Sequence, residues 1–316
     1  MSRYYLAPLE GITTYIFRNA YHRHFAPMDK YFTPFLVPHS KKGFSAKEKR
    51  EILPENNEGL YLVPQIMSNH AGDCLKTIGK LEGYGYKEIN LNMGCPSKTV
   101  VSKGRGSGFL AFPEELDRFL DAVFEGIGNT DMQISIKTRL GKDEPEEFGP
   151  ILEIYNRYPL KELIVHPRVQ KDFYKNEPNL PMFAYASGNS KSPVCYNGDI
   201  FTLKKYEEIR QAFPETEAFM LGRGILMDPL LLMRIKNQAG EEGAEKGKEQ
   251  AKLCSFHDRL YEDYRALGMG DKNVLFKMKE LWCYLGQSFP GQEKALKKIR
   301  KAERLDRYEA AVEELL

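Results

Sequence analysis

A cysteine just past the end of an apolar segment is the residue of this sequence best suited to chemistry. Cys95 lies between Gly94 and Pro96, whereas a buried structural thiol more often lies within the apolar run itself. Beside a reduced cofactor, a thiol in such a position can act as a general acid and deliver a proton. For a lone cysteine inert packing is the simpler interpretation, and only the surrounding residues argue against it.

A basic, glycine-rich stretch follows this cysteine and reads Lys103-Gly104-Arg105-Gly106-Ser107-Gly108. Glycines permit many backbone conformations, and the two cations can contact an anionic substrate. We therefore interpret this stretch as a lid or a substrate-facing loop, with Lys103 and Arg105 as contact residues.

Polar side chains also lie at the ends of other apolar segments. A lysine at the end of a buried strand is costly unless it has an anionic or electron-rich partner, which makes Lys137 a candidate ligand-binding residue. The alternative is an ordinary surface lysine, and for His166 alone it is a hydrogen-bonded structural histidine. Gln65 and Asn92 supply amide donors and acceptors that can read the edge of a planar ring.

Two glycine-containing loops, Asn197-Gly198-Asp199 and Gly222-Arg223-Gly224, predict a phosphate site. Glycines let backbone N–H groups approach an anion closely, and Arg223 adds a guanidinium that matches phosphate oxygens. Each loop by itself is equally well explained as a tight turn. In a β/α barrel, however, the loops after the last two strands commonly form a phosphate site.

Regular elements must position these residues, and the sequence predicts eight short strands with helices between them. Several strands are continuous apolar runs, as expected in a parallel sheet buried on both faces. The predicted strands are 4–7, 30–35, 60–66, 88–93, 133–138, 162–166, 193–196 and 217–221. The predicted helices are 14–25, 71–84, 113–127, 148–157, 203–213 and 228–236, with a short one near 45–52.

Strand–helix alternation repeated eight times predicts an α/β fold, a (β/α)8 TIM barrel followed by a small all-helical domain. Active-site residues of such barrels lie at the C-terminal ends of the strands, where the polar residues named above are found. We predict a catalytic barrel over 1–237, a polar linker over 238–250 and a helical domain over 251–316.

Bulk composition narrows the class of protein. The 316 residues are 42% hydrophobic and 28% charged with a formal net charge of only +2, which is typical of a globular protein and carries no bulk signal for nucleic acid. The five cysteines are scattered, so neither a disulfide framework nor a metal site is expected. Because no long apolar run or signal-peptide pattern is found, we expect a cytoplasmic protein without a membrane partner.

Together these segments resemble the tRNA-dihydrouridine synthase family over most of the barrel, from residue 6 to residue 224. Any one motif is weak, whereas five in order at strand ends are specific. The matching motifs are 90–96, 137–141, His166-Pro167-Arg168, 197–200 and Gly222-Arg223-Gly224. Pro167 replaces the more usual glycine of the family, which leaves the placement of Arg168 open.

The resemblance implies a reaction. Members of the family hold FMN over the barrel mouth, reduce it with NADPH and pass a hydride to C6 of a uracil in tRNA, while a cysteine matched here by Cys95 protonates C5. Saturating the C5=C6 bond requires both a hydride and a proton, which a flavin and a fixed acid supply. The uracil must leave its stack to reach the flavin.

The resemblance also assigns binding residues. Asn92 and Arg168 match positions near the substrate uracil, and Asp199 either contacts the flavin or orients its own loop. The family's flavin contacts are matched by Ala7, Pro8, Leu9, Gln65, Lys137, His166, Asn197, Gly198, Asp199, Gly222, Arg223 and Gly224.

The C-terminal region carries local charge that the total hides. Residues 294–307 include seven lysines and arginines against two acidic residues, with apolar residues at helical spacing. Alone, this pattern is explained by a solvated amphipathic helix; attached to this barrel, it is interpreted as a tRNA-binding surface. The predicted contacts are Lys277, Lys279, Lys297, Lys298 and Lys301.

Two other functions stay open. A flavin barrel that reduces or oxidises a free pyrimidine, as dihydroorotate and dihydropyrimidine dehydrogenases do, shares the chemistry but has no RNA backbone to hold. A non-catalytic RNA-binding barrel is the second alternative, and the combination of Cys95, Lys137, His166 and Arg223 argues against it.

Overall fold

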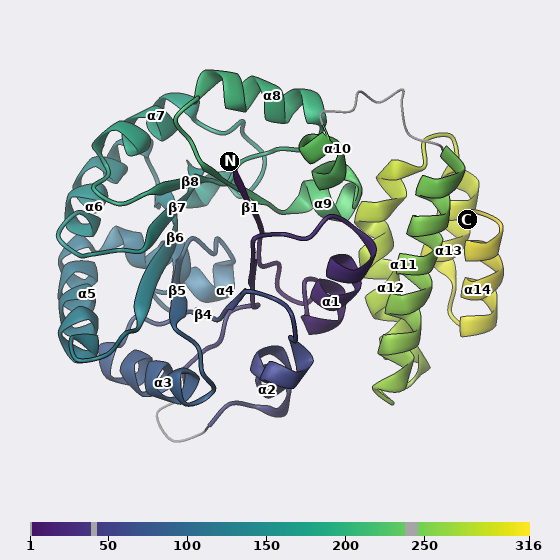
Figure 1. The fold of residues 1–316 in the computed structure, drawn as a ribbon, viewed down its shortest axis with the longest axis horizontal. Helices are drawn as coiled ribbons and strands as arrows, with labels where there is room; N and C mark the ends of the chain where they lie inside the picture. Colours follow the sequence, from purple (N-terminus) through teal and green to yellow (C-terminus); the bar gives the residue numbers. More distant parts are fainter. Residues whose placement is uncertain (1, 39–42, 238–245) are drawn as a thin grey trace. The chain divides into compact units, whose positions relative to one another are not determined.

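In the computed structural model, which describes residues 2–38, 43–237 and 246–316, nine strands form one parallel sheet (Figure 1). Their order is β3-β2-β1-β9-β8-β7-β6-β5-β4, so β1 lies beside β9, and every pair of consecutive strands except β3 and β4 is hydrogen-bonded. The strands are β1 Arg3–Leu6, β2 Lys30–Phe32, β3 Leu62–Val63, β4 Gln65–Ile66, β5 Glu88–Met93, β6 Gln133–Gly141, β7 Glu162–Val169, β8 Val194–Tyr196 and β9 Ala218–Leu221.

The barrel is closed by a strand that is interrupted in its middle. The predicted strand 60–66 is divided into β3 and β4 at Pro64, which has no N–H to give to a sheet ladder. β3 pairs with β2 and β4 pairs with β5, so the two halves join the two ends of the sheet. The predicted eight-strand TIM barrel is therefore confirmed, with its third strand in two pieces.

Burial explains the composition of the central strands. β5 and β7 are buried along their whole length, as the continuous apolar runs predict. The polar exceptions in β5, Glu88, Asn90 and Asn92, alternate with apolar residues and so share one face of the sheet.

One of two compact units of the chain comprises residues 1–8, 29–199 and 212–220. In it, α3, α5, α6 and α7 pack against one another in succession around the outside of the barrel (Figure 1). Its helices are α2 Ala46–Ile52, α3 Ala71–Gly83, α4 Lys98–Val101, α5 Pro113–Ile127, α6 Phe148–Tyr155 and α7 Leu180–Asn189, with 3-10 turns η1 Pro54–Asn56, η2 Gly106–Ala111, η3 Pro145–Glu147 and η4 Gln170–Asp172.

Most of these helices follow their sequence signals, and one does not. Pro113 opens α5 with Glu114 and Glu115 in its first turn, and a capping box of Ser45 and Glu48 opens α2. The sequence predicts no helix after the sixth barrel strand, yet α7 is found there. Its weak amphipathic pattern explains the difference, because only Phe183 and Ala186 are buried.

The other unit comprises residues 9–28, 200–211 and 221–316. Within it α1 packs on α11, where the ring of Phe256 lies 5.6 Å from that of Phe17 and 5.1 Å from that of Phe25. Its helices are α1 Tyr15–His24, α8 Leu203–Ala212, α9 Arg223–Met227, α10 Leu231–Asn237, α11 Lys246–Ala266, α12 Asp271–Leu285, α13 Glu293–Lys301 and α14 Leu305–Glu313, with a 3-10 turn η5 Gly286–Ser288.

Each of the two units is made of segments that alternate along the sequence with segments of the other. The unit that contains the C-terminal helices also takes in helices that the sequence assigns to the barrel, because α1 contacts α11 and α9 contacts α12. Of the predicted linker 238–250, the part after residue 245 lies in α11, and 238–245 fall outside the described residues. The domain boundaries drawn from the sequence therefore stay a prediction.

Candidate active site

Strand register brings the predicted residues of the first unit together. Gln65 and Asn92 lie at the ends of β4 and β5, and Lys137 on β6 is paired with Asn92. His166 on β7 is paired with Arg139. Because paired positions of neighbouring parallel strands share a face, these side chains form one cluster at the C-terminal ends of the strands, where barrel enzymes hold their active sites.

The ammonium group of Lys137 has no neutralising partner in this cluster. Among the described residues, no hydrogen bond or ion pair is made by its Nζ. Burial, with the charge of Arg139 as a second cause, lowers the pKa of Lys137 to about 8. Lys137 is half-buried, and a partly desolvated cation without a partner is poised for an electron-rich ligand.

Gln65 and Asn92 are occupied with each other and with the backbone. Nδ2 of Asn92 donates to Oε1 of Gln65 at 2.8 Å, and both side chains are buried. Oδ1 of Asn92 accepts the backbone N–H groups of Gly94 at 3.1 Å and Cys95 at 2.9 Å. Asn92 thus caps the loop that carries the cysteine.

Cys95 is half-buried in a loop held from several sides. Its carbonyl accepts bonds from the hydroxyl of Ser107 at 2.8 Å and from the Ser107 N–H at 3.1 Å. Nε of Arg139 donates to the carbonyl of Gly94 at 3.1 Å. Gly106 is required here, because its φ is +56° and an added Cβ would lie 2.8 Å from the Cys95 carbonyl oxygen.

These contacts correct the interpretation of 103–108 as a lid. Gly106–Ala111 form the turn η2, and all but the last of these residues are buried, so this part cannot open without losing its packing. Only the first part lies at the surface, with Lys103 exposed and Arg105 half-buried. Nε of Arg105 donates to Oδ1 of Asn69 at 3.2 Å, which holds the arginine beside the loop.

Arg168 is buried and its guanidinium is used within the protein. It donates to Oδ1 of Asp199 at 2.9 Å, with a second bond to Oδ2, and to the carbonyl of Asn176. Nη1 also lies 3.0 Å from Nε2 of His166. Since arginine only donates, Nε2 of His166 must accept, which leaves the imidazole neutral with its proton on Nδ1. This geometry favours a role in orienting His166 over a contact with substrate, and the carboxylate of Asp199 is engaged by the same guanidinium.

The remaining predicted residues of this unit lie after β1 and β8. Ala7 is buried and Pro8 half-buried, and Nδ2 of Asn197 donates to the carbonyl of Met220 at 2.8 Å. At Gly198 an added Cβ would lie 2.1 Å from the hydroxyl oxygen of Tyr196, so close packing alone accounts for this glycine.

Two residues not among the predicted site residues belong to the same cluster. The guanidinium of Arg139 lies 5.3 Å from the ring centre of Tyr174, and this ring meets His166 edge-on at 6.0 Å. Tyr174 is 49% exposed. The sequence signal for Arg139 was its place in the motif 137–141, whereas Tyr174 lies in a loop without any motif.

In the second unit, the residues predicted to bind phosphate begin a short helix. Arg223 is the first residue of α9, and its guanidinium lies 5.1 Å from the ring centre of Phe201. An added Cβ on Gly224 would lie 2.1 Å from the carbonyl oxygen of Ile200, so only glycine fits there. The backbone N–H of Leu9 donates to the hydroxyl of Thr13 at 2.8 Å, which holds the turn before α1.

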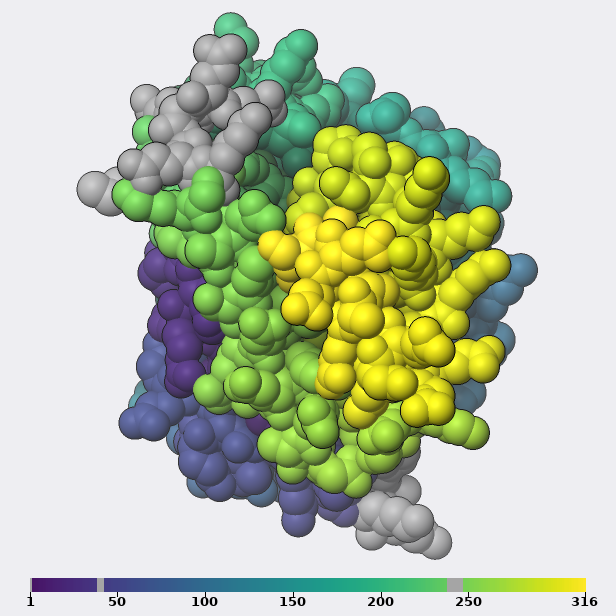
Figure 2. Space-filling model, turned by 90° about the vertical axis from the view of Figure 1, so that its right-hand side faces the viewer, coloured from purple at the N-terminus to yellow at the C-terminus, as the bar shows by residue number. Residues whose placement is uncertain are grey.

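The predicted RNA-contacting lysines fall into two classes. Lys277 and Lys279 are half-buried and donate to the carbonyls of Gly11 at 2.6 Å and Ala302 at 2.8 Å, so they hold the helical unit together. Lys297, Lys298 and Lys301 are exposed on α13, in the surface segment coloured yellow in Figure 2.

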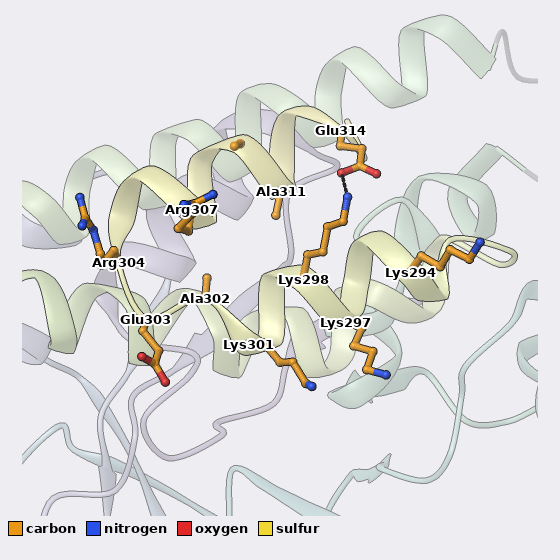
Figure 3. Close-up of a pocket in the computed structure, with 11 residues that line it drawn as sticks. Lys294, Lys297, Lys298, Lys301, Ala302, Glu303, Arg304, Arg307, Ala311 and Glu314 are labelled. Atoms are coloured by element: carbon orange, nitrogen blue, oxygen red, sulfur yellow. Dashed lines mark hydrogen bonds and ion pairs between the residues drawn. The ribbon is translucent and has the colours of Figure 1, made fainter.

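These three lysines line a groove of about 790 Å³ between α13 and α14. Figure 3 shows that lysines of α13 and arginines at and after the start of α14 surround it, with small alanines between them. Lys298 is paired across the groove with Glu314 at 2.5 Å. The basic lining contains Lys294, Lys297, Lys298, Lys301, Arg304 and Arg307.

The described residues show neither a metal cluster nor a membrane span. In ranges 2–38, 43–237 and 246–316, no three histidine, cysteine or acidic side chains are grouped so that they could hold a metal ion. No helix in these ranges is long and apolar enough to cross a bilayer.

Residues 5–314 match the model of one protein family, described as dihydrouridine synthase. A probable tRNA-dihydrouridine synthase of Helicobacter pylori (strain J99 / ATCC 700824) is 27% identical over 89% of this chain and 82% of its own length. One of Staphylococcus aureus (strain COL) is 27% identical over 82% of this chain and 77% of its own. The tRNA-dihydrouridine synthase B of Vibrio vulnificus (strain CMCP6) is 26% identical over 87% and 86%.

Solved structures with the same fold are more distant in sequence. Histamine dehydrogenase from Rhizobium sp. 4-9 has a TM-score of 0.54 at 11% identity and covers 75% of this chain and 46% of its own. Morphinone reductase in complex with tetrahydroNAD has a TM-score of 0.51 at 11% identity and covers 78% of this chain and 90% of its own. At this identity the likeness concerns the barrel fold alone.

Proposed function

The chain belongs to the dihydrouridine synthase family, and from this premise we propose that it reduces the C5=C6 bond of a uridine in tRNA with FMN as its flavin and NADPH as reductant. The observation that carries the proposal is that Cys95 follows the end of β5 and that Lys137, in the middle of β6, is paired with Asn92 near that end, within the family match. Bound FMN supplies the hydride for C6 of the uracil. We expect the protein to lie in the cytoplasm, together with the tRNA on which it acts.

The residues present fit a flavin. The unpartnered ammonium of Lys137 requires an electron-rich group, and the carbonyl-bearing edge of a flavin ring provides one. His166 lies on the neighbouring strand with its Nε2 held by Arg168. We assign the flavin contacts to Ala7, Pro8, Leu9, Gln65, Lys137, His166, Asn197, Gly198, Asp199, Gly222, Arg223 and Gly224.

Cys95 delivers the proton to C5 of the uracil. Its loop is held by Asn92 and Ser107, so the thiol stays in one place while the uracil is reduced. Asn92 contributes to uracil binding by fixing this loop. Arg168 acts behind His166 as a positioning residue.

The groove between α13 and α14 binds the phosphate backbone of the tRNA. Its exposed lysines and arginines present donors to phosphate oxygens, whereas half-buried Lys277 and Lys279 stabilise the helices that carry it. Replacing Lys297 and Lys301 by alanine is expected to weaken tRNA binding and reduce its salt dependence by about two phosphate contacts. Lys252→Ala, an exposed lysine on α11, is the control.

The decisive experiment is mass spectrometry of nucleosides and fragments from dihydrouridine-free tRNA that has been incubated with the protein, FMN and NADPH. A uridine that gains two hydrogens demonstrates the reaction and locates its position. Unchanged tRNA with a flavin still reduced by NADPH would favour a free-pyrimidine substrate. Absence of bound flavin would favour a non-catalytic RNA-binding barrel.

A further inference from the structure

A buried row of polar side chains crosses three neighbouring strands beneath the Cys95 loop. The register pairs Gln65 on β4 with Asn90 on β5, and Asn90 with Ser135 on β6. All three residues are 0% exposed. Buried polar groups in the middle of a sheet destabilise the fold unless their donors and acceptors are matched, so this row needs an explanation.

From Asn92 through Gln65 and Asn90 to Ser135, each side chain donates a hydrogen bond to the next, and Ser135 donates to a backbone carbonyl. The hydroxyl of Ser135 donates to the carbonyl of Ile89 at 3.2 Å and accepts from Nδ2 of Asn90 at 3.0 Å. Oδ1 of Asn90 accepts from Nε2 of Gln65 at 2.8 Å. Oε1 of Gln65 accepts from Nδ2 of Asn92 at 2.8 Å. We call Ser135, Asn90, Gln65 and Asn92 the amide row.

The direction of the amide row is fixed at the end nearest the cysteine. Oδ1 of Asn92 accepts the backbone N–H groups of Gly94 and Cys95, and a backbone N–H can only donate. If one amide were turned over, its NH2 group would face the NH2 group of its neighbour. The neighbour would have to turn as well, and so on until Asn92, whose oxygen must face the two backbone N–H groups. The row therefore has one arrangement, and Asn92 keeps its oxygen toward Cys95.

We propose that Asn90 and Ser135 are positioning residues for proton transfer, acting through Gln65 and Asn92 on the backbone of Cys95. The inference rests on the proposed function only for the role given to Cys95. Asn90, Ser135 and Gln65 are all 0% exposed, so their side chains act on the site through Asn92 and the backbone that it holds. Apolar residues would fill the same space without unmatched donors, but they could not orient Asn92.

The test uses two variants of the row and one matched control in the full-length holoenzyme. Asn90→Leu removes the acceptor of Gln65, and Ser135→Ala removes only the last acceptor and keeps the rest of the row. Asn57→Leu is the control, since Asn57 is also buried, at 5% exposed, and donates to the carbonyls of Glu51 and Leu53, outside the row.

The first readout is hydrogen exchange at the Gly94 and Cys95 backbone N–H groups, which needs no activity. We expect exchange to accelerate about tenfold or more in Asn90→Leu, less in Ser135→Ala and not in Asn57→Leu. Unchanged exchange in both row variants, or an equal acceleration in the control, overturns the proposal. If Asn90→Leu fails to fold, Ser135→Ala decides alone.

The second readout separates positioning from stability. Reduction of tRNA uridine by enzyme whose flavin is already reduced is expected to slow by about tenfold or more in Asn90→Leu, with flavin reduction by NADPH unchanged. In a Cys95→Ala background the same change is expected to cause little further loss. A full further loss there overturns the positioning role. If the wild type leaves tRNA unchanged, the proposed function fails and the exchange data still decide on the amide row.

Discussion

The barrel strands hold the same residue type, a lysine, in opposite surroundings: buried Lys30 at the start of β2 and half-buried Lys137 in the middle of β6. Lys30 begins β2, and its ammonium lies 2.8 and 3.0 Å from the carboxylate oxygens of Glu88 and 3.7 Å from Glu162. Lys137 has no such partner among the described residues. One lysine is matched within the protein and the other awaits a ligand.

The N-terminal end is matched further by two phenols. The hydroxyl of Tyr5 donates to Glu162 at 2.7 Å, and that of Tyr61 donates to Glu88 at 3.1 Å. A buried charge whose partners lie within the protein is accounted for by the fold, whereas a charge without one is suited to binding. The contrast teaches that burial of a charge does not identify a functional site, and that the missing partner does.

The largest effect is expected from breaking the matched end. Lys30→Met leaves two buried carboxylates without their cation and is expected to lower the free energy of unfolding by about 3–5 kcal/mol. Urea denaturation measures this loss. The folded fraction should bind FMN as the wild type does, and a loss below about 1 kcal/mol would mean that the network does not stabilise the fold.

At the functional end, Cys95→Ala is expected to slow reduction of tRNA uridine by about a hundredfold, or about 2.7 kcal/mol, because the general acid is gone. Quantifying dihydrouridine by mass spectrometry measures this. Flavin content and urea stability serve as controls and should be unchanged. Equal product formation by variant and wild type would remove Cys95 from this role.

Lys137→Met tests the unmatched lysine and is expected to weaken FMN binding about tenfold, or about 1.4 kcal/mol, with no loss of stability. Because the pKa of Lys137 is lowered to about 8, its ammonium becomes neutral as the pH rises through that value. The wild-type affinity for FMN should therefore fall above pH 8, which titration from pH 6.5 to 9.5 measures. An identical pH profile in Lys137→Met would contradict the assignment.

The smallest effect is expected for Glu162→Gln at the matched end. Burial raises the pKa of Glu162, with Lys30 opposing, so the folded protein holds this proton more tightly than the unfolded chain does. The group therefore favours folding below its unfolded pKa and loses that contribution as pH rises. Glutamine avoids this loss, and the variant is expected to lie within about 1 kcal/mol of the wild type at pH 7. Unfolding titrations from pH 4 to 7 should show the variant gaining on the wild type.

Elements with a strong periodic pattern could be predicted from the sequence. β5 and α5 are found at the predicted residues, and the other strands of the barrel differ from their predicted bounds by a few residues. The interruption of the third strand follows from Pro64, whose missing N–H the apolar pattern conceals. Helix α7 could not be predicted, because its contacts depend on neighbours that are distant in sequence.

Within the site, the types of residue could be predicted from the sequence, but their hydrogen-bond partners within the protein could not. Arg168 was assigned to the substrate by resemblance, yet its donors go to Asp199, His166 and Asn176. The sequence does not distinguish Lys277 from Lys297, but Lys277 donates to the carbonyl of Gly11 and Lys297 is exposed. Which groups are already satisfied depends on the positions of acceptors far along the chain.

The sequence by itself determined the barrel, its order of strands and the polar residues at their ends, since hydrophobic periodicity and short motifs are local properties of the chain. Tertiary structure alone decided which of those polar groups are matched within the protein. Ser135, Asn90 and Gln65 are ordinary residues on three separate strands until the register sets them side by side. Hydrogen bonds act over about 3 Å, so their partners are known only when the strands are placed.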